Sequence, residues 1–335
     1  MGNIFITGAT GFIGGHLARA NLALDHRVSA LVLDDDPGAD PLRQAGADIC
    51  YGDVCRPESL RKAVAGAEVV YHCAGVVTDW APRRLFSQVT VQGTENVCRA
   101  ALDAGVKRLV YISTNDVFGL DESRILDETC PLRPWREPYP DFKIQAEEIA
   151  WRYYREHGLP VAMVYPCWVY GPGDLTFVPL LADAIVKKEM LFWRRDVLVW
   201  PTYVDNLVDL MLHLAVNDRA IGNGYLVHDG RSTTLQEFCA AIAEFLEAKP
   251  PTRHIPYPAA YTAALVLETL WKLLRRSSRP LLTTYTVKNL GSRLRFSIDK
   301  AARELDWQPP VSFASGLQET LMWLQTLDHD QLKGK

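Results

Sequence analysis

The sequence lacks several local signatures that would point directly to a function. Its 335 residues contain no internal repeat and no low-complexity segment. The seven cysteines form no Cys-x-x-Cys pair, so we expect neither a zinc site nor a disulfide framework, and scattered thiols favour a reducing compartment. His16, His26 and His72 have no partners at ligand spacing, and no metal site is expected. No Gly-x-Ser-x-Gly elbow occurs, which removes the usual serine-hydrolase signature.

The sequence also lacks a large excess of either positive or negative charge. The 36 basic and 40 acidic residues give a formal net charge of −4, and no Lys/Arg block is longer than a pair such as Lys187–Lys188 or Arg275–Arg276. Such a chain has no overall positive electrostatic potential to attract the phosphates of a nucleic acid, so no nucleic-acid partner is expected. The first residues run directly into an apolar strand and leave no room for a secretion signal. We therefore expect a cytoplasmic protein.

Short β-rich runs alternate with longer helical patterns through the first half of the chain. Several of these runs are apolar at consecutive positions, as in Val69-Val70-Tyr71, which is typical of parallel strands covered on both faces. The alternation predicts an α/β fold with a doubly wound parallel sheet. The predicted strands are 4–7, 28–33, 49–51, 69–73, 109–113 and 161–165, and the predicted helices are 12–24, 57–65, 84–104 and 141–157.

The alternation ends after about residue 166. Further helices are predicted near 203–216, 234–247, 259–274 and 314–327, with one more strand at 225–228. We therefore expect a first domain at 1–165, with later returns near 203–228, and a smaller, mainly helical C-terminal part at 166–330 that binds the substrate.

A glycine-rich segment, Thr7-Gly8-Ala9-Thr10-Gly11-Phe12-Ile13-Gly14, lies between the first predicted strand and the first predicted helix. Gly8 permits a tight turn, Gly11 lets a pyrophosphate approach the backbone, and Gly14 lets helix and strand pack closely. The pattern predicts that the first domain binds a dinucleotide. The residues expected to hold it are Gly8, Thr10, Gly11, Phe12, Ile13 and Gly14.

An acidic cluster follows the second predicted strand. Asp34 lies at the distance from Gly14 where an acidic residue usually holds the adenosine ribose. Asp35 and Asp36 follow it, and three carboxylates would repel a 2′-phosphate. The cluster favours NAD, with NADP as the alternative; solvated loop charges are the other interpretation.

Tyr139 and Lys143 lie four residues apart at the start of a predicted helix that Pro140 can open. A neighbouring ammonium and a cationic nicotinamide lower the pKa of a phenol, which can then exchange a proton with a substrate oxygen. Thr114 closes the fifth strand at the edge where open α/β sheets bind ligands, and its hydroxyl can hold the same oxygen. The sequence therefore predicts a catalytic trio for hydride transfer, Thr114, Tyr139 and Lys143.

The segments TGATGFIG, YISTNDVFG, YPDFK, VYGPGD and YVDNLVD resemble, in order and spacing, the extended short-chain dehydrogenase/reductases of the NAD-dependent epimerase/dehydratase superfamily. Within these, the chain is similar to the 3β-hydroxysteroid dehydrogenase-like branch. The resemblance implies a Rossmann domain, a catalytic Ser/Thr at Thr114, an acid/base at Tyr139, and a ribose-binding lysine at Lys143. Relatives often pair as homodimers. The resemblance also implies cofactor contacts from Asp53, Val54, Cys73, Ala74, Gly75, Pro166, Trp168 and Val169.

Four positions depart from the family pattern. Thr90 stands where the family usually has Asn, Phe118 replaces a common Tyr, and Tyr165 replaces a common Arg. Val32 occupies the position where many relatives carry the ribose-binding acid, although strand alternation would put Asp34 on the same side. The catalytic trio itself matches the family.

Aromatic residues are frequent in the segments expected to cover the site. A pocket lined by such residues favours a bulky apolar substrate, while core packing is the other interpretation. The residues predicted to contact the substrate are Trp80, Thr114, Trp168, Phe177 and Trp193.

Residues 257–276 are broadly apolar and end in Arg275–Arg276, but they are too short and too interrupted to span a bilayer. A helix that lies on the inner face of a membrane and takes up a lipophilic substrate has this pattern. A lid or a domain-packing helix has it as well, and both interpretations stay open here.

The predicted function is an NAD(P)-dependent oxidoreductase that interconverts a secondary alcohol and a ketone on a hydrophobic substrate. This substrate would be steroid- or terpenoid-like, or a β-hydroxy acid whose oxidation is followed by decarboxylation. A nucleotide-sugar epimerase or dehydratase with retained NAD is the first alternative, with Lys187, Arg194 and Arg195 as cationic clamps. A non-catalytic dinucleotide sensor is the second; such relatives can lose the Tyr/Lys pair, which this chain keeps.

Overall fold

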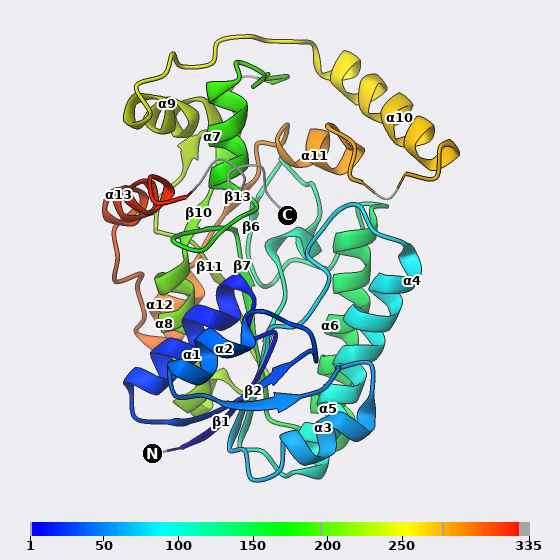
Figure 1. The fold of residues 1–335 in the computed structure, drawn as a ribbon, viewed down its shortest axis with the longest axis vertical. Coiled ribbons are helices and arrows are strands. Elements are labelled where there is room, and N and C mark those ends of the chain that lie inside the picture. The colour runs from blue at the N-terminus through cyan, green and yellow to red at the C-terminus, as the bar shows by residue number, and fades with distance from the viewer. Residues whose placement is uncertain (1, 195, 277, 328–335) are drawn as a thin grey trace.

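A sheet of seven parallel strands forms the centre of the molecule, in the order β11-β7-β5-β4-β1-β2-β3. The computed structural model describes residues 2–194, 196–276 and 278–327 (Figure 1). The strand order reverses between β1 and β4, so the sheet is doubly wound and the fold-class prediction is confirmed. The strands are β1 (Asn3–Thr7), β2 (Arg27–Val32), β3 (Asp48–Tyr51), β4 (Val69–His72), β5 (Arg108–Ile112), β7 (Val161–Pro166) and β11 (Gly224–Val227).

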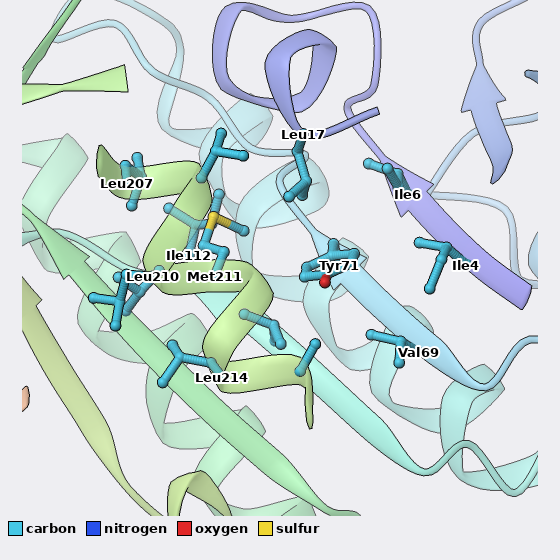
Figure 2. Close-up of a cluster of buried hydrophobic side chains, with 14 of the residues drawn as sticks. Ile4, Ile6, Leu17, Val69, Tyr71, Ile112, Leu207, Leu210, Met211 and Leu214 are labelled. Carbon is cyan, nitrogen blue, oxygen red and sulfur yellow. The ribbon is translucent and has the colours of Figure 1, made fainter. Parts of the chain in front are cut away.

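Helices cover both faces of this sheet. On one face lie α1 (Phe12–Ala23) and α8 (Val204–Val216), and on the other α3 (Pro57–Ala63), α5 (Gly93–Asp103) and α6 (Pro138–His157). Each face buries its own apolar cluster, which explains why the strands are apolar at consecutive positions. Figure 2 shows the layer between the strands and α1 and α8, in which it labels Ile4, Ile6, Leu17, Val69, Tyr71, Ile112, Leu207, Leu210, Met211 and Leu214.

Two helices differ from the predictions near the site. The predicted helix 84–104 consists of α4 (Arg83–Leu85), a π-helical stretch at Phe86–Gln92, and α5. The predicted helix 141–157 begins earlier, at Pro138, which takes the position that Pro140 was expected to hold. Both Tyr139 and Lys143 therefore lie within α6.

The chain after β7 adds a third layer above the carboxyl ends of the strands (Figure 1). Its largest apolar cluster joins α7 (Val178–Val186), α9 (Leu235–Phe245) and α13 (Phe313–Leu324). A smaller cluster joins α10 (Tyr257–Leu273) to α11 (Thr284–Asn289). No described helix is both long enough and apolar enough to cross a membrane.

Several short elements were not predicted, because two- or three-residue strands and single helical turns leave no periodic pattern. The helices that were not predicted are α2 (Ala39–Gln44), α7, α11 and α12 (Asp299–Leu305), all of nine residues or fewer, with 3-10 turns at Asn115–Phe118 and Asp218–Ala220. The strand pairs are β8 (Trp168–Tyr170) with β10 (Pro201–Tyr203), β9 (Leu198–Val199) with β12 (Thr233–Thr234), and β6 (Ile125–Leu126) with β13 (Arg295–Phe296).

A buried histidine connects three elements beneath the glycine loop. His72 ends β4, and its Nδ1 lies 2.7 Å from Thr7 Oγ1 while its Nε2 lies 3.0 Å from Thr94 Oγ1. These contacts join β1, β4 and α5. Burial, assisted by the ammonium of Lys143, lowers the pKa of His72 to about 3. The ring is therefore neutral in the folded protein.

This buried histidine predicts an acid-sensitive fold. Unfolded, His72 binds a proton near its ordinary pKa of 6.5, whereas the folded protein excludes that proton down to about pH 3. Because the unfolded state then holds more protons, stability is complete above pH 6.5 and is lost below it, by ~1.4 kcal/mol per pH unit. In His72→Gln the free energy of unfolding should fall less steeply between pH 7 and 5 than in the wild type, as measured by urea denaturation.

The control is His213→Gln, which alters an exposed histidine on α8 and should keep the wild-type slope. His228, also buried, is present in all three proteins, so its contribution cancels. Equal slopes for His72→Gln and the wild type would contradict the prediction.

Candidate active site

The glycine loop has the geometry expected of a dinucleotide cradle. Gly8 adopts a φ of +69°, and the N–H of Gly11 donates to Gly8 O at 3.1 Å. A side chain on Gly14 would bring its Cβ to 2.1 Å from Gly8 O, so only glycine allows α1 to approach the loop. No side chain caps α1 and no acidic residue lies in its first turn, which leaves its N–H groups for a pyrophosphate. The loop therefore fits the dinucleotide.

One carboxylate of the acidic cluster contacts this loop, and it is Asp36. Its Oδ2 accepts from Thr10 Oγ1 at 2.6 Å, and its Oδ1 accepts from Gly38 N at 2.8 Å. Asp34 is exposed and follows the end of β2 by two residues, so its contact with the ribose stays a prediction. Asp36 is a loop contact that the sequence did not single out within the acidic triplet.

The segment after β4 lies between the glycine loop and Lys143. A side chain on Gly8 would place its Cβ 2.8 Å from Ala74 N, and one on Gly75 would place its Cβ 3.9 Å from Lys143 Nζ. Residues Cys73, Ala74 and Gly75 therefore run from one to the other, as a cofactor lying along them requires.

The other adenine-side residues are held by local hydrogen bonds. Asp53 Oδ1 accepts from Cys55 N at 2.8 Å, and Val54 O accepts from Asn96 Nδ2 at 2.8 Å. Both residues follow β3, which is separated in the sheet by β2 alone from β1, the strand that leads into the glycine loop. Their contact with the adenine stays a prediction.

The predicted catalytic trio comes together at the carboxyl end of β5. Lys143 Nζ donates to Ile112 O, the last residue of that strand, at 2.7 Å, and lies 5.0 Å from the centre of the Tyr111 ring. Thr114 is buried and forms a hydrogen bond with the phenol of Tyr139. The hydroxyl and the phenol therefore lie together at the ligand-binding edge of the sheet, and the ammonium is held at the last residue of the same strand.

Burial dominates the pKa values of Tyr139 and Lys143 in the protein chain alone. Burial and the charge of Asp116 raise the pKa of Tyr139, and its hydrogen bond with Thr114 only partly offsets them. Burial also lowers the pKa of Lys143 to about 8. The predicted lowering of the Tyr139 pKa by the ammonium together with an oxidised nicotinamide stays a prediction; in the protein chain alone, the Lys143 ammonium is hydrogen-bonded to Ile112 O.

Two of the predicted substrate residues, Trp168 and Phe177, lie together beyond the end of β7. β7 ends at Pro166, and β8 begins at Trp168, whose ring centre lies 5.0 Å from that of Phe177. Phe177 in turn stacks on Phe238 of α9 at 5.5 Å. Val169 is half-buried between the two large clusters. Contact of these residues with a ligand stays a prediction.

The two other predicted substrate tryptophans lie against α10 and α11. The Lys272 ammonium of α10 sits 5.6 Å from the centre of the Trp80 ring. The Trp193 indole is buried, and its Nε1 donates to Val287 O of α11 at 3.0 Å. Trp193 therefore supports α11, and substrate contact by either tryptophan stays a prediction.

A tyrosine from α11 reaches the trio, and the sequence did not reveal it. Tyr285 Oη donates to Asp116 Oδ2 at 2.7 Å, and its ring lies 6.1 Å from that of Tyr139 and 5.6 Å from that of Trp135. Asp116 is buried, and burial raises its pKa to about 6. No local pattern could have indicated this pair, because the two residues are 169 positions apart in the chain.

A second buried network lies directly behind the trio. Glu147, one turn after Lys143, accepts from Ser113 Oγ at 2.7 Å, from Tyr165 Oη at 2.7 Å and from Trp151 Nε1 at 3.2 Å. Tyr165 stands where the family usually has an arginine, so three neutral donors satisfy this carboxylate in place of a cation. Burial accordingly raises the pKa of Glu147.

Two of the three proposed cationic clamps already have acidic partners. Both terminal nitrogens of Arg194 contact Glu122, at 2.7 and 3.1 Å, and one also donates to Gly291 O. Lys187 pairs with Asp183 one turn earlier in α7. Arg195 lies outside the described residues.

The glycine loop yields a direct prediction. In Gly14→Ala the new methyl group overlaps Gly8 O and displaces the loop, so NAD affinity should fall about tenfold or more, the equivalent of one charge-assisted hydrogen bond. Gly15→Ala is the matched control, because its Cβ would lie at an ordinary 3.5 Å from Ala9 O. Calorimetry with NAD measures both. Wild-type affinity in Gly14→Ala would contradict the role given to this glycine.

Comparison with known proteins places the chain among dehydrogenases and reductases. A ketoreductase of Stigmatella aurantiaca acting on 4-hydroxy-2-methyl-3-oxo-4-farnesyl-3,4-dihydroquinoline-1-oxide is 33% identical over 317 residues, 93% of this chain and 94% of that protein. A 2-alkyl-3-oxoalkanoate reductase of Stenotrophomonas maltophilia is 28% identical, covering 94% and 97%. A 3β-hydroxysteroid dehydrogenase/Δ5→4-isomerase of Mycobacterium tuberculosis is 28% identical, covering 100% and 93%.

Solved structures agree with this placement. The crystal structure of gox2253 superposes with a TM-score of 0.81 at 26% identity, covering 97% of this chain and 98% of that one. DesIV, a dTDP-glucose 4,6-dehydratase of Streptomyces venezuelae solved with NAD, gives a TM-score of 0.78 at 25% identity, covering 96% of each chain. The profile of the NAD dependent epimerase/dehydratase family matches residues 4–227. The chain therefore belongs to this NAD-dependent family, as an oxidoreductase of the extended short-chain dehydrogenase/reductase class.

Proposed function

We propose that the protein interconverts a secondary alcohol and a ketone on a hydrophobic substrate, with Thr114, Tyr139 and Lys143 as its catalytic residues. The observation that carries the proposal is the meeting of these three side chains at the carboxyl end of β5, beside the segment Cys73 to Gly75 that leads to the glycine loop. The glycine loop and the segment Cys73 to Gly75 would hold NAD, which would supply hydride acceptance for alcohol oxidation and, in its reduced form, hydride donation for ketone reduction.

Each member of the trio has one task in this proposal. The Thr114 hydroxyl and the Tyr139 phenol hold the reacting oxygen between them, and the phenol takes or gives its proton. Lys143, fixed on Ile112 O, holds a positive charge beside the cofactor. Because burial raises the pKa of Tyr139, its phenolate needs a nearby positive charge in alcohol oxidation, which the ring of an oxidised nicotinamide would supply.

The relatives narrow the proposed substrate. The names of three of them describe a quinoline oxide with a farnesyl chain, a 2-alkyl-3-oxoalkanoate, and a 3β-hydroxysteroid. All three are lipophilic molecules that carry a ketone or a secondary alcohol. The first two carry a second oxygen function one or two carbons from the reacting ketone, and a 3-oxoalkanoate can lose its carboxylate afterwards. We extend the class, a lipophilic ketone or secondary alcohol, to this chain.

The nucleotide-sugar alternative has less support. Structures of that class share the fold, as the dehydratase from Streptomyces venezuelae does. A sugar diphosphate needs free cations, however, and both Arg194 and Lys187 are already paired with carboxylates. The trio also argues against a non-catalytic sensor, which has no use for a buried Tyr/Lys pair.

The proposal includes a preference of the cofactor site for NAD over NADP. Asp36 places a carboxylate against Thr10 of the glycine loop, and no Arg stands at the end of β2 to receive a 2′-phosphate. A phosphate near this carboxylate would meet like charge. NAD is therefore the proposed coenzyme of this site.

Removing one phenol oxygen tests the catalytic assignment. Tyr139→Phe should bind NAD as tightly as the wild type, while turnover falls roughly 10²- to 10⁴-fold because the proton has no carrier. The reaction is followed by absorbance of the reduced nicotinamide with a panel of sterols, β-hydroxy acids and UDP-sugars. Tyr154→Phe, on the same helix and away from the trio, is the control.

Near-normal turnover in Tyr139→Phe would remove the phenol from the mechanism. Turnover of UDP-sugars with no net consumption of nicotinamide, in protein that purifies with NAD already bound, would instead assign the epimerase or dehydratase activity.

The proposal also includes peripheral membrane contact through residues 257–276, where the lipophilic substrate would enter. The outward face of α10 carries no charge from Pro258 to Leu270, and its only deeply buried residues are Ala260 and Ala264. Glu268, its one acid, points inward, where its Oε1 accepts from Thr284 N and Oγ1. The exposed apolar residues of this face are Ala259, Ala263, Leu265, Val266, Leu270, Leu273 and Leu274.

Charge and position both favour an anionic lipid surface as the occupant of this face. Lys272, Arg275 and Arg276 cluster at the end of α10, where headgroup phosphates would meet them. In Figure 1, α10 projects from the third layer, and it packs on α11, which carries Tyr285 into the site. A molecule leaving a membrane at α10 would therefore arrive next to the trio.

Vesicle sedimentation tests the lipid contact. The wild type should bind vesicles of equal parts phosphatidylcholine and phosphatidylglycerol, and Val266→Glu with Leu273→Glu should weaken binding roughly tenfold or more, because two charges enter the apolar face. Val216→Glu, at a position 79% exposed on α8, should bind like the wild type. If the wild type ignores vesicles and the double variant instead turns a dimer into monomers, the face is a homodimer interface.

A further inference from the structure

Asp116 is a buried carboxylate next to the catalytic trio that hydride transfer does not use. It lies two residues after Thr114, and its N–H donates to Thr114 Oγ1 at 3.3 Å. Its side chain is enclosed by aromatic rings, with Tyr285 in direct contact and Tyr139 and Trp135 beside that ring. No cation of the described chain pairs with it. A charge left in such a place needs a polar partner.

Only half of this carboxylate is satisfied within the protein. Oδ2 accepts from Tyr285 Oη at 2.7 Å, whereas no hydrogen bond from the described residues reaches Oδ1. Oδ1 is not fully enclosed, although Asp116 is only 4% exposed. An acceptor atom is thus left over on a side chain that lies two residues after Thr114 and contacts Tyr285, whose ring neighbours that of Tyr139.

The position of Tyr285 is fixed from both sides. Before it, Arg279 donates to both oxygens of Asp79, at 2.6 and 2.8 Å. After it, Lys288 donates to Glu137 Oε1 at 2.6 Å, and Asn289 Nδ2 donates to Tyr285 Oη at 3.0 Å. With its own proton directed at Asp116, the Tyr285 hydroxyl holds the carboxylate in one orientation. The free oxygen therefore points to a defined place.

We propose that Asp116 and Tyr285 form a polar subsite that binds a second hydroxyl group of the substrate, adjacent to the oxygen held by Thr114 and Tyr139. This inference rests on the proposed function and narrows its substrate class to molecules with two neighbouring oxygen functions. The substrate hydroxyl donates to Asp116 Oδ1. No bond is made or broken in this subsite, which orients the substrate so that the carbon bearing the other oxygen faces the cofactor.

The chemistry of the surroundings selects a hydroxyl over other groups. A carboxylate on the substrate would be repelled by Asp116, and a lone carbonyl has no proton to donate to Oδ1. An ammonium would meet the positive charges of Lys143 and the oxidised nicotinamide nearby. A neutral hydroxyl avoids all three conflicts and satisfies the remaining acceptor.

Paired probes test the subsite. Octane-2,3-diol and octan-2-ol differ by one hydroxyl, and calorimetry on the complex of the protein with NAD compares their affinities. The wild type should bind the diol about tenfold or more tightly, the range of one hydrogen bond to a charged group. Asp116→Asn, which replaces the acceptor by an amide, and Tyr285→Phe, which releases it, should each reduce that ratio several-fold. Asp121→Asn, in the same loop, should keep it.

The outcomes separate this inference from the proposed function. Failure of the diol to bind more tightly than octan-2-ol, or an unchanged ratio in both variants, overturns the subsite. Tighter binding of 3-aminooctan-2-ol than of the diol overturns the choice of a hydroxyl. If the diol binds more tightly but neither alcohol is oxidised, the subsite stands and the proposed reaction is wrong. Thermal unfolding identifies a variant that fails to fold, in which case the other variant decides.

Discussion

The hydrogen bond from Lys143 Nζ to Ile112 O is the contact on which the site depends. It joins the first turns of α6 to the last residue of β5, and so fixes Tyr139, on the same helix face, opposite Thr114, which follows the same strand. Burial makes this contact strict, because an ammonium removed from water must keep its acceptor. The helix cannot slide along the sheet without leaving that charge unpaired. In the proposed mechanism, proton transfer at one oxygen therefore depends on a helix-to-strand contact formed within the protein itself.

The sequence predicted the elements that follow local rules. The glycine loop depends on spacing and on the turn at Gly8, and the Tyr139–Lys143 pair depends on one helical turn, so both could be found without a structure. The parallel strands were visible from consecutive apolar residues. Contacts between distant parts of the chain were not visible, as the bond between Tyr285 and Asp116 illustrates. The choice of Asp36 over its neighbours at the glycine loop also needed the backbone of the turn that follows β2.

Polar groups near the site are satisfied in two different ways. Behind the trio, Glu147 is fully enclosed and saturated by Ser113, Tyr165 and Trp151, which makes that side a rigid support. In front of it, Asp116 keeps one oxygen without a partner among the described residues. The same contrast occurs in the apolar residues, which are buried on both faces of the sheet but exposed along α10. An open acceptor and an exposed apolar helix face are thus both available to the lipophilic substrate that we propose.

The ties that hold α11 also have a consequence for how the protein is made. Arg279 pairs with Asp79 across 200 positions of sequence, and Lys288 reaches Glu137 across 151. Contacts of such separation form late, since a long loop must close before they stabilise anything. The first domain, residues 1–165, can therefore begin to fold on the ribosome before α11 brings Tyr285 to the site. A nascent chain that binds its coenzyme early would then have no complete substrate site, and no activity, until α11 has left the ribosome and docked.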